Sequence, residues 1–78
     1  MDIHHLVKMA NEIATYYEQY PDHAEAVGAV AVHIKNYWEP RMRRQIIAHV
    51  VDEGGKDLKD LVREAILTLA DGAGAPVR

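Results

Sequence analysis

Three interruptions divide this chain of 78 residues into four segments, and each segment carries the periodicity of a helix. The interruptions lie at residues 20–22, at Pro40 and at residues 52–55, which end in two glycines. Proline disfavours the helical conformation in the residue before it, and paired glycines readily adopt the left-handed conformation that follows a helix end. The sequence therefore predicts four helices in series.

Within each segment the apolar residues recur three and four positions apart, which places them on one side of a helix. The four predicted apolar faces are, in chain order, Ile3, Leu6, Val7, Ala10, Ile13, Ala14 and Tyr17; Val27, Val30, Ala31, Ile34 and Trp38; Met42, Ile46, Ile47 and Val50; and Leu58, Leu61, Val62, Ala65, Ile66 and Leu69. Asp2 is the expected N-cap of the first helix, which should run to about residue 18. Asp22 and Glu25 have the spacing of a capping box at the start of the second helix.

Proline and a third aspartate predict the later helix boundaries. The second helix should end near residues 37–38, because Pro40 follows. Pro40 suits the first position of the third helix, where its missing N–H costs nothing, and this helix should reach Val51. Asp57 is the predicted N-cap of the fourth helix.

Four helical segments with short connections and no convincing strand alternation indicate an all-α fold, a small compact antiparallel bundle of four short helices. A chain of this length has too little interior for two cores, so residues 1–70 are expected to form a single helical domain. Residues 71–78, which include two glycines, are expected to form a flexible C-terminal tail. Helices about 17 to 25 Å long leave little room for an internal ligand pocket.

The composition removes most catalytic chemistry. The chain has no cysteine and no serine, which excludes disulfides, thiolate metal sites and the two commonest side-chain nucleophiles. Five histidines remain, but none belongs to a metal-binding motif: His4 and His5 are adjacent and point to different sides of a helix. His49 and Glu53 stand four residues apart, and one such pair is weak evidence for a metal. We therefore predict no catalytic residue, no metal ligand and no bound cofactor.

Positive charge is concentrated in the middle of an acidic chain. The formal net charge is −3. Residues 35–51 carry a net +3, from one lysine and three arginines against one glutamate, whereas residues 1–34 carry −4 and residues 52–78 carry −2. A locally basic segment on an acidic chain suggests a docking surface for an acidic partner, although a solvated helix face would show the same pattern.

Residues 37–44 combine the only tryptophan with a tyrosine, a methionine and three arginines, around a proline that fixes the turn. Tryptophan, tyrosine and arginine dominate the binding energy of protein interfaces. We expect Trp38 to be mostly buried at the helix corner and the arginines to point outward. The candidate partner-binding residues are Tyr37, Trp38, Pro40, Arg41, Met42, Arg43 and Arg44. The alternative is that Trp38 and Met42 belong only to the core and that the arginines are solvated.

The segment Tyr-Trp-Glu-Pro-Arg-Met-Arg at residues 37–43 resembles the central signature of the delta subunit of NAD-dependent formate dehydrogenases that contain molybdenum or tungsten. Residues 6–13 resemble the opening helix of that family, and residues 61–65 resemble its closing helix. The resemblance implies a non-catalytic accessory subunit in a hetero-oligomer whose larger subunits hold the pterin, iron–sulfur and flavin cofactors. It also implies docking on the catalytic alpha subunit, in support of assembly, cofactor retention or stability.

One other function competes with this interpretation, and another is compatible with it. A helical nucleic-acid-binding module could use the arginines of the third segment, but an acidic chain lacks the extended positive surface that such binding needs. A self-associating module is compatible with the leading interpretation, because an isolated copy could form a homodimer through its docking face. Residues 1–5 show neither a secretory signal nor the start of a membrane span, so we expect a cytoplasmic protein without membrane contact.

Overall fold

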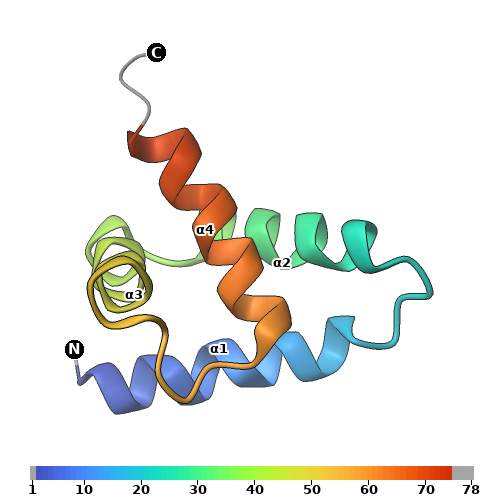
Figure 1. Cartoon of the computed structure of the whole chain (residues 1–78), viewed down its shortest axis with the longest axis horizontal. Coiled ribbons are helices and arrows are strands. Elements are labelled where there is room, and N and C mark those ends of the chain that lie inside the picture. Colours follow the sequence, from blue (N-terminus) through green and yellow to red (C-terminus); the bar gives the residue numbers. More distant parts are fainter. Residues whose placement is uncertain (1, 75–78) are drawn as a thin grey trace.

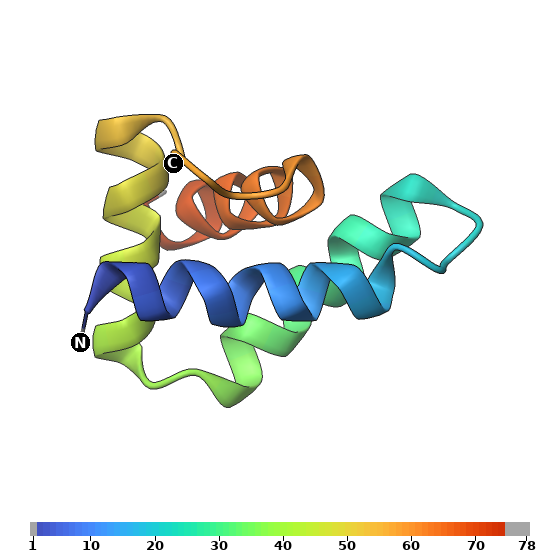
Figure 2. The same cartoon turned by 90° about the horizontal axis from the view of Figure 1, so that it is seen from below.

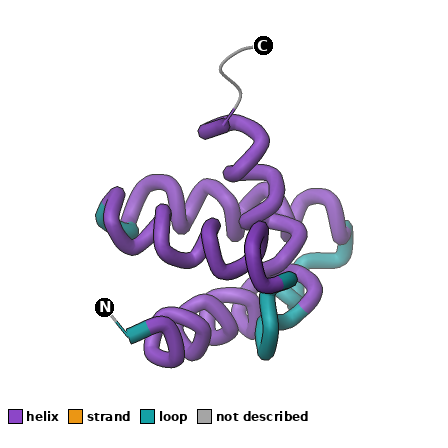
Figure 3. Tube along the Cα trace, turned by 60° about the vertical axis from the view of Figure 1, so that its left-hand side comes forward, coloured by secondary structure: helices purple, strands orange, loops and turns teal. Residues whose placement is uncertain are grey.

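A computed structural model describes residues 2–74 and contains four helices. They are α1 (Ile3–Tyr17), α2 (His23–Tyr37), α3 (Pro40–Glu53) and α4 (Asp60–Gly74), and within these residues there is no strand (Figures 1 and 3). The predicted all-α fold is confirmed. The last helix includes residues 71–74, which the sequence assigned to the C-terminal tail, and residues 75–78 of that tail lie outside the described residues.

The first three helices begin where the sequence predicts, and α3 runs two residues past the predicted Val51, to Glu53. The carboxylate of Asp2 accepts a hydrogen bond from the backbone N–H of His4 at 3.2 Å. Asp22 accepts one from the N–H of Ala24 at 3.3 Å, so it is the N-cap of α2 through the second helical residue and not through Glu25, the partner that a capping box would use. α3 ends at Gly54, whose φ of 75° is left-handed and therefore favours a residue without a Cβ.

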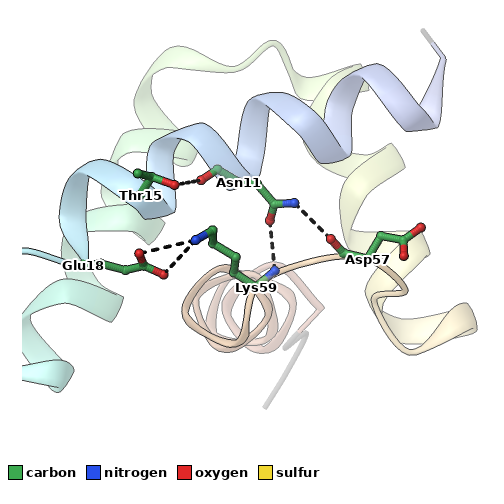
Figure 4. Close-up of polar contacts among 5 residues, drawn as sticks. All are labelled: Asn11, Thr15, Glu18, Asp57 and Lys59. Carbon is green, nitrogen blue, oxygen red and sulfur yellow. Dashed lines mark hydrogen bonds and ion pairs between the residues drawn. The ribbon is translucent and has the colours of Figure 1, made fainter.

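The start of α4 differs from the prediction, because Asp57 is not its cap. The helix begins at Asp60, and Asp57 has a left-handed φ of 70°. The side-chain amide of Asn11 on α1 donates to the carbonyl oxygen of Asp57 at 2.9 Å and accepts from the N–H of Lys59 at 2.9 Å (Figure 4). These two bonds hold the connection against α1. They join residues more than forty positions apart, so the local sequence does not reveal them.

The helices cross one another instead of lying in an antiparallel bundle. α1 and α2 run in opposite directions but cross obliquely, α3 is seen end-on in Figure 1, and α4 crosses in front of α2 (Figures 1 and 2). α4 contacts all three other helices, with its largest contact on α2. The predicted antiparallel order is therefore wrong beyond the first two helices. Alanines at the buried faces allow close crossing, and the direction of crossing depends on how those faces fit.

The core consists of the apolar faces that the sequence predicts. Its buried members are Leu6, Val7, Ala10, Ala14, Ala26, Val30, Ala31, Ile34, Trp38, Ile46, Val50, Leu58, Leu61, Val62, Ala65 and Ile66. Of these, Ala26 alone lies outside the predicted faces. The other predicted members, such as Ile13 and Met42, are partly buried and pack against this core. No polar or charged residue is buried among the described side chains, so the chemistry that this part of the chain offers lies at its surface.

Candidate partner-docking site

Two residues, Trp38 and Glu39, form the whole connection between α2 and α3. The N–H of Trp38 makes the last hydrogen bond of α2, to the carbonyl oxygen of Ile34 at 3.1 Å. Both connecting residues are extended, and Pro40 then occupies the first turn of α3, where proline's fixed φ suits a helix. The side chain of Trp38 is 5% exposed and belongs to the core. The prediction that the tryptophan is buried at the helix corner is confirmed.

The guanidinium of Arg43 stabilises the turn between α2 and α3 through hydrogen bonds to backbone carbonyl groups. Its Nη1 donates to the carbonyl oxygen of Lys35 at 2.9 Å and to that of Trp38 at 2.8 Å. Carbonyl groups at the end of α2 lack helical partners, and a positive charge there also interacts favourably with the helix dipole. Arg43 is half-buried. The prediction that all three arginines point outward is therefore wrong for Arg43, because its guanidinium binds backbone carbonyl oxygens at the end of α2.

Arg41 and Arg44 are exposed within the first five residues of α3. They stand three residues apart, so they share one side of the helix. Pro40, which precedes them in the chain, is also exposed. We call Pro40, Arg41 and Arg44 the basic turn. The seven predicted residues thus divide into an exposed set (Tyr37, Pro40, Arg41 and Arg44) and a set in the core or the turn (Trp38, Met42 and Arg43).

Sequence reasoning did not find that aromatic rings form a connected set over α1 and α2. The ring centroids of Tyr16 and Tyr17 are 4.9 Å apart, and those of Tyr17 and Tyr20 are 5.3 Å apart. His33 lies 6.2 Å from Tyr17 and 4.9 Å from Tyr37. We call these five residues the aromatic face. The sequence signal was the group of tyrosines at residues 16, 17 and 20 and the four-residue spacing of His33 and Tyr37, whereas the approach of Tyr17 to His33 depends on how α1 and α2 lie against each other.

His23 and His49 each contact a group on another segment of the chain. His23 Nε2 lies 2.9 Å from a carboxylate oxygen of Glu64 on α4. His49 Nε2 lies 2.9 Å from the carbonyl oxygen of Lys56, and this contact replaces the His49–Glu53 pair considered from the sequence. Within residues 2–74, no three side chains of metal-ligating type come together.

The fold and the site define a small helical protein whose distinctive chemistry lies on an exposed turn and an adjoining aromatic surface. A family model, that of the NADH-dependent formate dehydrogenase delta subunit FdsD, matches residues 5–66. The chain belongs to this family, and the family that the sequence resembles is confirmed. No curated protein and no solved structure matched the chain. None of the helices in the described residues is long and apolar enough to span a membrane.

Proposed function

We propose that this chain is a non-catalytic accessory subunit of a multisubunit NADH-dependent formate dehydrogenase and acts in the cytoplasm. It docks on the catalytic alpha subunit and supports assembly, cofactor retention or stability. The match to the delta-subunit family over residues 5–66 carries this proposal. The composition agrees with it, because a chain without cysteine or serine offers no thiolate ligand for iron–sulfur clusters and neither of the two commonest nucleophiles.

The basic turn is the surface through which we propose that docking occurs. Arg41 and Arg44 are exposed, while buried Trp38 and the two hydrogen bonds of Arg43 fix the backbone beneath them. Because the backbone beneath these arginines is fixed, binding need not order the turn, and the entropy cost is confined to their side chains. Guanidinium groups bind carboxylates through paired, charge-assisted hydrogen bonds, so the basic turn fits an acidic surface on the partner.

A docked subunit can stabilise an enzyme without taking part in its chemistry. If it binds the folded, cofactor-loaded enzyme and not the unfolded form, it stabilises the former by mass action. The effect is about 2.7 kcal/mol when the free subunit is present at a hundred times its dissociation constant. Loss of the subunit would therefore lower the amount or the cofactor content of the enzyme.

Deletion of the chain tests the functional proposal. We expect formate-dependent NAD reduction to fall, and the cause is found by measuring alpha-subunit abundance and the molybdenum or tungsten content per alpha subunit. Low abundance with normal metal content would indicate stabilisation, whereas normal abundance with low metal content would indicate cofactor insertion or retention. If activity, abundance and metal content are all unchanged, the proposed function is wrong.

Charge reversal tests the docking surface. The double variant Arg41→Glu/Arg44→Glu should bind poorly to formate dehydrogenase purified from a strain that lacks this chain, with little effect on its own fold. The matched control is Lys8→Glu/Lys56→Glu, which makes the same change in net charge at two exposed cations away from the turn. Binding is measured by biolayer interferometry. Equal losses in both double variants would contradict a role specific to the basic turn.

A further inference from the structure

All four tyrosines of the chain belong to the aromatic face, which includes the C-terminal parts of α1 and α2 and Tyr20 in the connection between them. Tyr16 is 63% exposed, Tyr20 39% and Tyr37 76%, whereas Tyr17 and His33 lie partly buried beneath them. Tyr17 packs against the core. The exposed rings therefore rest on rings that are fixed by the fold, which makes the surface aromatic and preorganised.

The aromatic face has the opposite electrostatic character to the basic turn. The one lysine of α2, Lys35, stands two residues from both His33 and Tyr37, and side chains at that spacing do not share a side of a helix. The one lysine of α1 precedes Tyr16 by eight residues, about 12 Å along the axis. Glu12 stands four residues before Tyr16 and four residues after Lys8, so it shares their side of α1 and lies between the lysine and the ring. The faces of aromatic rings carry partial negative charge, and a carboxylate adds to it.

We infer that the aromatic face is a second docking surface, which binds a segment of the same enzyme that presents arginine or lysine side chains. The inference rests on the proposed function for the identity of the partner. A cation placed over a tyrosine ring is attracted by the ring's quadrupole, and the attraction grows as water is excluded. Charge complementarity favours this occupant over an acidic segment, which the rings and Glu12 would repel.

Tyr37 places the two surfaces next to each other. It is the last residue of α2, and the two hydrogen bonds of Arg43 bind that end of α2 to the first turn of α3. The basic turn, which would bind anionic groups, and the aromatic face, which would bind cationic groups, therefore lie on either side of one fixed turn. A subunit built in this way joins two partner segments of opposite charge, and the joining depends on both surfaces at once.

The test replaces the two most exposed rings in the full chain. Tyr16→Leu/Tyr37→Leu removes the π systems and keeps apolar side chains, whereas Tyr16→Phe/Tyr37→Phe keeps the rings and removes the hydroxyl groups. Binding to formate dehydrogenase purified without this chain is measured by biolayer interferometry. We expect the leucine pair to lose about tenfold in affinity, as two exposed cation–π contacts would, and the phenylalanine pair to stay within about twofold of wild type.

A second variant covers the case in which the leucine pair fails to fold. Glu12→Lys puts a cation one helical turn from Tyr16 on an exposed position, so we expect weaker binding with unchanged circular dichroism. The matched control is Glu25→Lys, an exposed charge reversal in the first turn of α2. Weaker binding of Glu12→Lys alone supports the inference, and equal binding of both variants overturns it.

The outcomes separate this inference from the proposed function. If the wild-type chain does not bind the enzyme, the proposed function fails and the inference fails with it. If the basic-turn variant loses binding while the leucine pair binds like wild type, only the second surface is wrong. Equal losses for leucine and phenylalanine would also overturn the inference, because they would assign the effect to the hydroxyl groups. Sedimentation of the isolated chain as a dimer that the leucine pair separates would mean that a second copy covers the aromatic face.

Discussion

Replacement of Arg43 tests whether this arginine stabilises the turn between α2 and α3, in contrast to Arg41 and Arg44, which we propose bind a partner. Its Nη1 donates to two carbonyl oxygens at 2.8 and 2.9 Å. Arg43→Met keeps most of the apolar stem and removes every donor, so the partly buried carbonyl of Trp38 loses its charged partner. Hydrogen bonds that involve a charged group contribute about 1.5–3 kcal/mol, and water reaches part of this site. We therefore expect a loss of about 2 kcal/mol in the free energy of unfolding.

The assay is thermal and urea unfolding of the isolated chain, followed by circular dichroism. A domain of this size loses about 4–8 °C in melting temperature per kcal/mol, so Arg43→Met should melt roughly 8–16 °C lower than wild type. The matched variants Arg41→Met and Arg44→Met change exposed arginines on the same helix and should stay within about 0.5 kcal/mol of wild type. If Arg43→Met is no less stable than these two, the hydrogen bonds of Arg43 do not hold the turn and the argument fails.

Three further predictions concern the fold and its chemistry. Trp38→Ala should lose about 3–5 kcal/mol, which is close to the whole net stability of so small a core, and a cooperative melt with full helical ellipticity would contradict this. Asn11→Leu should lose about 1–2 kcal/mol and speed hydrogen exchange at the amide of Lys59, so unchanged exchange there would refute the role of Asn11. The purified chain should contain no stoichiometric metal and should not shift duplex DNA at low salt, and elemental analysis and a gel-shift assay check these two expectations.

The connection held by Asn11 shows how α1 positions the last helix. The side-chain amide of Asn11 makes the two bonds to the connection. Its backbone carbonyl oxygen accepts a further hydrogen bond from the hydroxyl of Thr15 at 3.0 Å (Figure 4). Lys59 also reaches Glu18 on α1, with 3.3 Å between the ammonium nitrogen and a carboxylate oxygen. This ion pair is nearly half exposed, so it contributes little, and the two bonds of the Asn11 amide are the main polar link between α1 and the start of α4.

The sequence by itself determined the elements of this protein and the composition of its core. Apolar spacing places almost every buried residue on its helix, because the period of a helix and the cost of exposing apolar area are local properties. The caps Asp2 and Asp22 and the left-handed Gly54 follow for the same reason, since their partners lie within a few residues. Trp38 could be placed in the core because it continues the apolar stripe of α2 up to the turn.

The tertiary structure decided what depends on contacts between distant residues. The crossing of the helices follows from how their faces fit, and periodicity does not contain that information. α4 begins at Asp60 because Asn11 holds the residues before it, whereas Asp57 looks like a cap when only its neighbours are considered. The inward orientation of the Arg43 guanidinium and the contact between Tyr17 and His33 likewise depend on the path of the chain. Which arginine of α3 is inward, and which aromatic rings meet, is decided only when α2 lies beside α3 and α1.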